Sequence, residues 1–487
     1  MNAYVQNSNL KKAEALWTRM EKVIGGNGGN SGNRRVFNRL FEAYMQTHSE
    51  DQFLGIFDLL DYMEKHHDIQ KNPEADLKRY TTVISHMHGY YYAIEKTKDV
   101  LKLIEKRKMK LDDVLHNAVL KNFASQDAQE AEKYLIQLEN DGWNMTGIYY
   151  DLVIQAYAKQ KSLEGARKAA QLLDRAFDIY DTKKLKSFPH PRTLNTIIKA
   201  VGLSGEIDAA KKAEEIMLKS MNPSTESYNT LLYVLEKTRS GKRAEKILDH
   251  MELLNNSGNE SVKPNKLSYK RVFNAWIRSE EDDALEQTFK FWQKYHKKYP
   301  NTLKITDYHA IMIKCANSYD SDSLEKLLHL IKVMEKESNF KPNKHTYTIL
   351  LRKCQNSAIR SQNNHEVERE KAKQLFEISS AAFKQIVTSP DFERDDNVFA
   401  MFLQCSMELL PNNDNQGIQP SSREQVAAAL FHKACNDGLL SVRILRKILE
   451  EKELAIKLIG SIDTNDVGEI LEKLPESWSC NAPKSIT

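Results

Sequence analysis

The chain has 487 residues, of which 41% are hydrophobic and 28% are charged, with 18 glycines and five cysteines. This composition is typical of a soluble, helix-rich protein. No run approaches the roughly 18 consecutive apolar residues of a membrane-spanning helix, so we expect no membrane partner. The formal net charge of +4 is too small to indicate nucleic acid by itself.

The first 33 residues predict the end of one helix, a turn and a second amphipathic helix over 3–20, followed by a Gly/Asn-rich loop over 25–33. The chain therefore starts inside a helical hairpin. A terminal repeat needs a polar cap, so we expect 1–33 to be a truncated leading repeat of an incomplete chain. On that reading, a missing targeting peptide decides nothing about the compartment.

From residue 34 onward a short phrase recurs every 34 to 44 residues, as in RTLNTIIKAV at 192–201 and ESYNTLLYVL at 226–235. In each copy, one register position directly follows an aromatic residue or leucine. The nine register residues are Asn38, Thr81, Asn117, Asp151, Asn195, Asn229, Lys270, His309 and Thr348. A period of this length is that of one helix–turn–helix unit, which buries its apolar face only by stacking on neighbours. The sequence therefore predicts an all-α solenoid.

Nine units are predicted, and in each the pattern is that of two amphipathic helices. Their bounds are 34–76, 77–112, 113–146, 147–190, 191–224, 225–265, 266–304, 305–343 and 344–395. Polar stretches at 72–75, 255–261 and 357–366 are expected to be loops. One apolar position of the first helices is expected to lie on a shared face, at Ile198, Leu232, Ile313 and Leu351. Residues 396–487 are expected to form a degenerate repeat and a C-terminal helical cap with a flexible tail.

Catalytic and metal-binding patterns are scarce. The cysteines form no CxxC, and Cys315 and Cys354 stand 39 residues apart, which predicts equivalent core positions in two adjacent first helices. The close pair His86 and His88 falls late in a first helix, where neighbouring positions face different sides. No phosphate-binding glycine loop or deaminase motif is present. We therefore expect no enzyme activity, cofactor, metal or small-molecule substrate.

The phrases TLNTII and SYNTLL, the alanine-rich second helices and the Lys-Pro-Asn links resemble the pentatricopeptide repeat (PPR) family. Its repeats open with Tyr-Asn-Thr-Leu-Ile and end in Lys-Pro-Asp. The resemblance covers 34–395 and is sharpest at 191–275 and 305–354. It implies a right-handed solenoid like the family's P-type arrays, with irregular repeat lengths. The tetratricopeptide repeat, a rival of similar period, places a small residue where this chain has the large apolar position described above.

The resemblance implies binding of single-stranded RNA at one base per repeat, read by the register residue and the last residue of the unit. Carried over, the pairs are Asn38 with Asp76 for uracil, Thr81 with Asp112 and Thr348 with Asp395 for guanine, Asn195 with Ser224 for cytosine, and Asn117 with Thr146 and Asn229 with Asn265 for pyrimidines. The pairs Asp151 with His190, Lys270 with Lys304 and His309 with Asn343 depart from the family pattern, and their units are expected to bind backbone or nothing.

Two further sets of side chains are expected to contact the RNA. Val114, Ile148 and Leu267, three residues before a register position, fit a wedge between bases, and Lys159, Lys237 and Arg278 fit a basic stripe. Helix capping is the competing interpretation of the polar pairs, and a solvated helix face that of the stripe.

The resemblance implies a sequence-specific RNA-binding protein of a mitochondrion or chloroplast, acting in transcript stability, processing or translation. The alternative is a tetratricopeptide-like scaffold that binds protein partners with the same surface. Basic and polar side chains on the first helices favour RNA, whereas an apolar surface favours protein.

Overall fold

The computed structural model describes residues 15, 30–46, 49–65, 73–182, 185, 190–206, 208–219, 223–300, 302–336, 341–358, 367–393, 395–410, 422–460 and 466–482. The helix predicted over 3–20 lies outside this part, apart from residue 15. Throughout the described ranges the regular secondary structure is helical and includes no strand. The helices form two compact units, residues 1–238 with 251–263 and residues 239–250 with 264–487.

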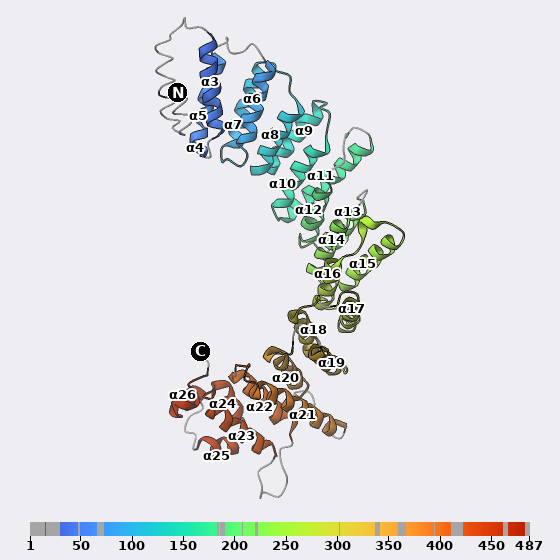
Figure 1. The fold of residues 1–487 in the computed structure, drawn as a ribbon, viewed down its shortest axis with the longest axis vertical. Coiled ribbons are helices and arrows are strands. Elements are labelled where there is room, and N and C mark those ends of the chain that lie inside the picture. The colour runs from blue at the N-terminus through green and yellow to red at the C-terminus, as the bar shows by residue number, and fades with distance from the viewer. Residues whose placement is uncertain are drawn as a thin grey trace. The chain divides into compact units, whose positions relative to one another are not determined.

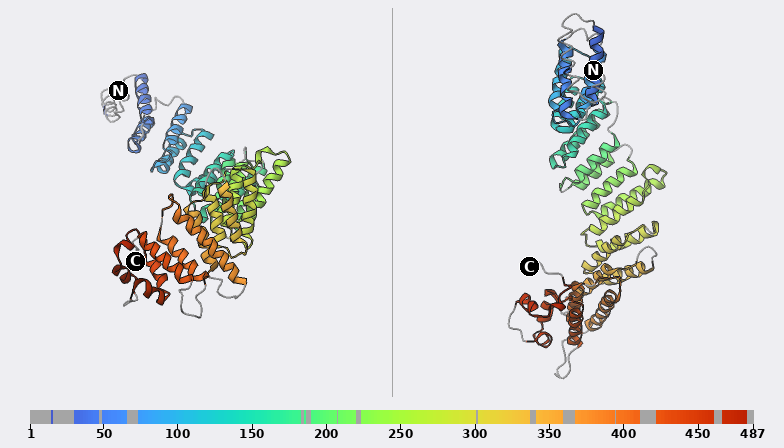
Figure 2. Two further views of the ribbon diagram at one scale, coloured as in Figure 1. Left: turned by 60° about the horizontal axis from the view of Figure 1, so that its bottom comes forward. Right: turned by 60° about the vertical axis from the view of Figure 1, so that its left-hand side comes forward.

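The first unit is built of consecutive helical hairpins, visible as successive layers in Figures 1 and 2. Its helices are α3 (Asn30–Met45), α4 (Glu50–Phe53), α5 (Gly55–Lys65), α6 (Pro73–His86), α7 (Ala93–Lys106), α8 (Asp113–Gln126), α9 (Ala128–Asn140), α10 (Gly147–Lys159), α11 (Leu163–Asp181), α12 (Pro191–Gly202), α13 (Ala209–Leu218) and α14 (Thr225–Lys237). The first helices α6, α8, α10, α12 and α14 contact one another in sequence order, and each second helix contacts the first helix of its own hairpin.

The second unit repeats this arrangement. Helix α15 (Gly241–Asn256) is shared between the two units, and the 3-10 turn η2 (Glu260–Val262) belongs to the first. The remaining helices are α16 (Lys266–Arg278), α17 (Ala284–Lys298), α18 (Ile305–Asn317), α19 (Ser323–Lys336), α20 (Lys344–Ala358), α21 (Val367–Thr388), α22 (Asp396–Leu409), α23 (Ser422–Asn436), α24 (Val442–Leu449), α25 (Lys452–Ile459), α26 (Val467–Lys473) and the turn η4 (Glu476–Trp478). Helices α16, α18, α20, α22, α24 and α26 contact one another in order. The α-solenoid fold is thus present in both units.

The helices form where the apolar stripe and the capping residues require them. Ala209, Ala210 and Ala213 of α13 are buried, and their small side chains allow α13 to pack closely on α12. Gly202 ends α12 at a point where a β-carbon would overlap with Val234 of α14. Each fully buried Leu or Ile in these stripes stabilises the fold by about 1.5–3 kcal/mol. Within each unit, neighbouring repeats are joined by contacts between successive first helices and by contacts of a second helix with the first helix that follows it.

Three sequence expectations need correction. The shared apolar position is buried at Ile198, Leu232 and Leu351, but Ile313 is only half-buried and Met312 takes that place. The reason is spacing, because Met312, like the other three, stands three residues after its register residue. Helices α3 and α6 also begin within segments predicted as loops, at Asn30 and Pro73.

Lysines fix the spacing of adjacent first helices in the second unit. The ammonium of Lys314 on α18 donates to the carbonyl oxygens of Trp276 (3.0 Å), Ile277 (3.1 Å) and Ser279 (2.7 Å) at the end of α16. Lys353 on α20 donates to the Ser318 carbonyl at 2.8 Å, one repeat later. Each lysine satisfies carbonyl groups left without intrahelical partners at a helix C-terminus, and so ties that end to the next repeat.

Cys315 and Cys354 are buried on α18 and α20, with free thiols. Burial raises the pKa of both thiols to about 12, so they remain protonated at neutral pH. Within the described ranges, no helix is long and apolar enough to cross a membrane. Nor does that part of the chain contain a cluster of three or more His, Cys, Asp or Glu side chains placed to hold a metal ion.

Candidate nucleic-acid interface

The predicted residue pairs occupy constant positions on the first helices. From α8 to α18, the closing residue of a unit is the N-cap of the next first helix, and the register residue of that helix stands five residues later. The N-cap and register residues are Asp112 and Asn117, Thr146 and Asp151, His190 and Asn195, Ser224 and Asn229, Asn265 and Lys270, and Lys304 and His309. A closing residue therefore adjoins the register residue of the following unit.

Most closing residues use their side chains as caps. Asp112 accepts from the Leu115 N–H at 2.8 Å, and Asn265 accepts from the Ser268 N–H at 3.1 Å in a reciprocal capping box. Ser224 and Asp395 likewise accept from the N–H group three residues later, which belongs to Ser227 and Val398 respectively. The capping interpretation thus describes the geometry of these four side chains, each of which still has acceptor capacity left.

Asp76 departs from this rule. It lies inside the first turn of α6, is 2% exposed, and pairs with Arg79 (2.7 Å) and Arg107 (3.5 Å). Asn38, its predicted partner, accepts from the second nitrogen of the Arg79 guanidinium at 3.1 Å. Arg79 therefore joins the two residues of the predicted pair, a role that sequence spacing did not reveal.

Two threonines at register positions bond to their own helices. Thr81 is buried and donates to the Leu77 carbonyl at 2.9 Å, and Thr348 donates to the Lys344 carbonyl at 2.9 Å. The ammonium of Lys344 also pairs with Asp395 at 2.7 Å, so Lys344 contacts both residues of the predicted pair Thr348 and Asp395. Both hydroxyls retain acceptor capacity.

In three units the register residue bonds to the next repeat. The Asp151 carboxylate accepts the His190 N–H at 3.0 and 3.1 Å, Lys270 pairs with Asp307, and His309 bonds to the Thr346 hydroxyl at 2.9 Å. These are the three units whose pairs depart from the family pattern. We call Asp151, Lys270 and His309 the occupied positions.

In two units the register residue keeps an oxygen without a partner. The Oδ1 atoms of Asn117 and Asn195 accept no hydrogen bond from any residue that the structure describes, and neither does the Oγ1 atom of Thr146. All three residues are half-buried, with these oxygens covered by neighbouring atoms. A covered oxygen without a donor costs free energy. We call Asn117 and Asn195 the open positions; Asn229 is half-buried on α14.

Large apolar side chains are exposed at the start of three first helices. Val114 is 63% exposed, Ile148 54% and Leu267 46%, and each stands two residues after its N-cap. These are the three residues predicted as wedges between bases. Their exposure leaves these three side chains accessible to a ligand.

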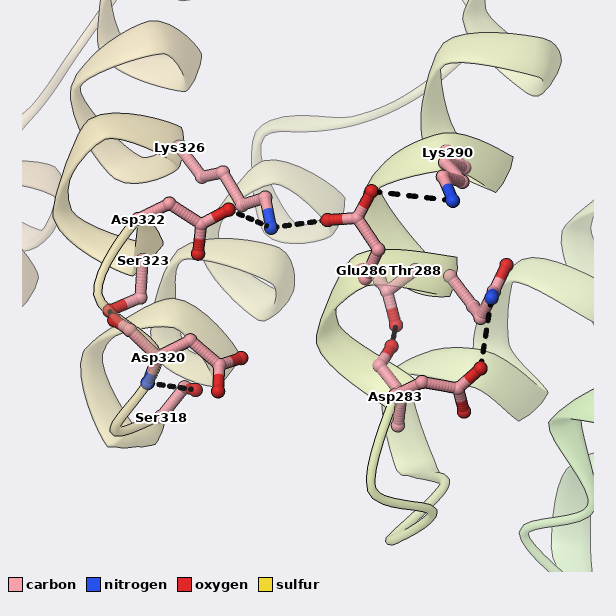
Figure 3. A network of polar contacts seen from close by, with 11 residues as sticks. Asp283, Glu286, Thr288, Lys290, Ser318, Asp320, Asp322, Ser323 and Lys326 are labelled. Atoms are coloured by element: carbon pink, nitrogen blue, oxygen red, sulfur yellow. Dashed lines mark hydrogen bonds and ion pairs between the residues drawn. The ribbon is translucent and has the colours of Figure 1, made fainter.

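Ion pairs between repeats are most regular along the second helices. Successive second helices are joined by ion pairs, as shown for Lys326 with Glu286 in Figure 3. Others are Lys98 with Glu130, Lys168 with Glu132, Lys219 with Asp174, Lys294 with Asp249 and Lys457 with Glu424. On the first helices, exposed cations that form no ion pair with a described residue include Lys121, Lys159, Lys199, Lys237 and Arg352, whereas Arg39 of α3 pairs with Glu42. Exposed lysines without such a pair also occur on the second helices, at Lys211, Lys242 and Lys332.

The first-helix cations lie near one another. The pKa of His88 is lowered by burial and by the positive charges of Lys121 and Lys159, which come from two neighbouring repeats. Lys199 and Lys237 both lie over the Tyr233 ring, at 5.5 and 5.4 Å from its centroid. The sequence pattern predicted Lys159 and Lys237 but not Lys121 and Lys199, which stand one helical turn beyond a register residue.

Comparisons with known proteins find similarity to pentatricopeptide repeat proteins. A family model described as PPR repeat matches residues 1–23 and 226–255. The pentatricopeptide repeat-containing protein At5g25630 of Arabidopsis thaliana is 22% identical over 149 residues, which make up 30% of this chain and 23% of that relative. The crystal structure of the pentatricopeptide repeat protein PPR10 from maize has a TM-score of 0.50 and 16% identity, over 97% of this chain and 57% of the maize chain. This chain therefore spans less than two thirds of either protein, and the maize structure shows the fold that it shares.

Proposed function

We propose that this pentatricopeptide repeat protein binds single-stranded RNA along the face formed by its first helices. The observation that carries the proposal is a set of exposed first-helix cations that lie near their counterparts in neighbouring repeats and form no ion pair with a described residue. In the first unit these cations are Lys121, Lys159, Lys199 and Lys237, and in the second unit Arg352 occupies a first helix in the same way. Unpaired cations along one face attract a phosphate backbone. The small net charge of +4 is therefore compatible with a basic surface on the first helices.

We further propose that the open positions contact bases. Asn117 with Thr146 would select a pyrimidine and Asn195 with Ser224 a cytosine, and a base could donate to the oxygens that lack a partner. Because these oxygens are covered, base contact requires the amide to rotate toward solvent. Val114 and Ile148, exposed on the same helix starts, are placed to stack against bases.

At the occupied positions the RNA would pass without base contact, because the side chains are held by the next repeat. The uracil and guanine assignments for 34–76 and 77–112 require Asn38 and Asp76 to leave Arg79, and Thr81 and Asp112 to use remaining acceptor capacity. With N-terminal repeats toward the 5′ end, as the resemblance implies, the preferred string is U-G-pyrimidine-any-C-pyrimidine. Asn229 with Asn265 supplies the last pyrimidine.

The biological role that fits such binding is control of transcript stability, processing or translation in a mitochondrion or chloroplast. The alternative role is a scaffold for protein partners. The exposed Val114, Ile148 and Leu267 are compatible with it, but a peptide does not require the unpaired first-helix cations. RNA binding is therefore the function that the geometry supports better.

The test compares two double substitutions that remove equal charge. The variant Lys121→Gln/Lys199→Gln loses two unpaired cations of the first helices. The variant Lys168→Gln/Lys219→Gln loses two cations that form ion pairs between second helices. Binding to single-stranded RNA is measured against salt concentration. The first variant should bind more weakly, with a salt slope smaller by about 1.4, at about 0.7 per contact to a single strand. Equal losses in both variants, or no RNA binding by the unmodified chain at low salt, would overturn the proposal.

A further inference from the structure

The solenoid continues beyond residue 395 in repeats that become shorter. Helices α22, α24 and α26 contact one another in order, and α23 contacts α25, which is the pattern of the first and second helices of earlier repeats. The helix pairs shorten from 14 and 15 residues in α22 and α23 to eight and eight in α24 and α25. The cap predicted over this region therefore contains a complete small repeat (Figure 1).

The register of the earlier repeats transfers directly to this small repeat. Ser441 is the N-cap of α24, so its wedge position, two residues on, is Arg443, and its register position, five residues on, is Arg446. The two arginines are three residues apart and share one face of the helix. The wedge position and the register position of this small repeat are thus both arginines.

The charges of these two arginines are available. Both are exposed, and neither forms an ion pair or hydrogen bond with any residue that the structure describes. Three other cations of these repeats are paired, namely Lys447 with Glu450 at 2.8 Å, Arg423 with Glu451 at 2.5 Å and Lys457 with Glu424 at 3.2 Å. The opposite face of α24 is anchored by the buried Ile444, Leu445 and Ile448. The helix therefore presents Arg443 and Arg446 outward from a fixed support.

We propose that Arg443 and Arg446 bind the phosphate backbone of the RNA beyond its base-reading segment, as an anchor independent of sequence. This rests on the proposed function. Guanidinium groups match phosphate oxygens in bidentate geometry and cannot lose their charge at neutral pH. The intervening repeat of α22 has Ala400 at its register position, which offers no side-chain donor or acceptor to a base. The array thus ends in charge contacts rather than base contacts.

The experiment uses the full chain and two RNAs. The core RNA has about nine nucleotides, one for each of the nine predicted units, and the long RNA adds about four unrelated nucleotides at one end. Arg443→Gln/Arg446→Gln is compared with the matched control Lys447→Gln/Lys457→Gln, which removes the same charge from paired lysines in this region. Thermal unfolding checks that all chains fold alike.

We expect the unmodified chain and the control to bind the long RNA severalfold more tightly than the core RNA, for an extension at one of the two ends. The arginine variant should lose this gain and keep its affinity and base preference for the core RNA. The same tetranucleotide added separately should not compete, because the contact depends on the connected strand. A gain from the extension that persists in the arginine variant would overturn the anchor. So would an unmodified chain that binds the core RNA without gaining from either extension. Failure of the unmodified chain to bind even the core RNA would refute RNA binding itself.

Discussion

The occupied and open register positions lie at the same place on the first helices but differ in whether the side chain bonds to the next repeat. At Asp151, Lys270 and His309 the side chain reaches the start of the next first helix and bonds there. At Asn117 and Asn195 the side-chain oxygen has no described partner. A side chain already bonded within the protein stabilises the stack, whereas one without a partner gains more from a ligand. On the proposed function, stability and recognition are divided between repeats at one structural position.

The largest expected effect is on stability at an occupied position. In Asp151→Ala the His190 N–H loses its carboxylate acceptor, and a hydrogen bond to a charged group contributes about 1.5–3 kcal/mol. Urea unfolding measures the change. Asp151→Asn keeps one acceptor oxygen and should lose less, and Asn195→Ala should unfold like the unmodified chain. A larger loss in Asn195→Ala than in Asp151→Ala would contradict the division.

The next effect is on recognition at the open positions. RNA is first selected from a random pool, which should enrich the predicted string over its reverse. Asn117→Ala/Asn195→Ala should then bind the selected RNA about thirtyfold more weakly, at about 1 kcal/mol for each lost hydrogen bond. It should bind scrambled RNA as before. Enrichment of unrelated sequences, or unchanged discrimination in the double variant, would refute the base assignments and leave the fold untouched.

The smallest effect is a pH dependence at His309. Burial, with the neighbouring His345, lowers the pKa of His309 from 6.5 to about 4. The unfolded chain therefore binds more protons between these values, so this contribution to stability is complete above about pH 6.5 and falls as the pH drops toward 4. At about pH 5.5 the loss should be about 1 kcal/mol. His309→Gln should remove this part of the pH dependence in urea unfolding. An unchanged pH profile in that variant would assign it to other groups.

Local spacing predicted the features that repeat. The stripe containing Ile198, Leu232 and Leu351 follows from helical periodicity, and exposure at Val114 and Ile148 follows from a fixed distance to the helix start. These properties depend on neighbours within about two helical turns. For the same reason, the sequence also located the N-caps that coincide with the closing residues.

What sequence could not predict depends on contacts between repeats. Asp76 is held by Arg107, 31 residues away, and Asp151 by the backbone of His190, 39 residues away. No local pattern marks such partners, so the predicted pairs did not reveal which side chains were already engaged. The shortened repeat of α24 and α25 was missed because its helices have only eight residues each, too few for a period to stand out.

The lysines that join first helices in the second unit have a mechanical consequence. A solenoid becomes longer when the gap between neighbouring repeats widens. Lys314 bridges this gap with three bonds to the end of α16, and Lys353 bridges the following gap. Separating these repeats would leave the carbonyl groups and the lysine ammonium without hydrogen-bond partners at the same time. The pitch of this segment is therefore set by the protein, and a strand bound across it would have to adopt that pitch rather than impose its own.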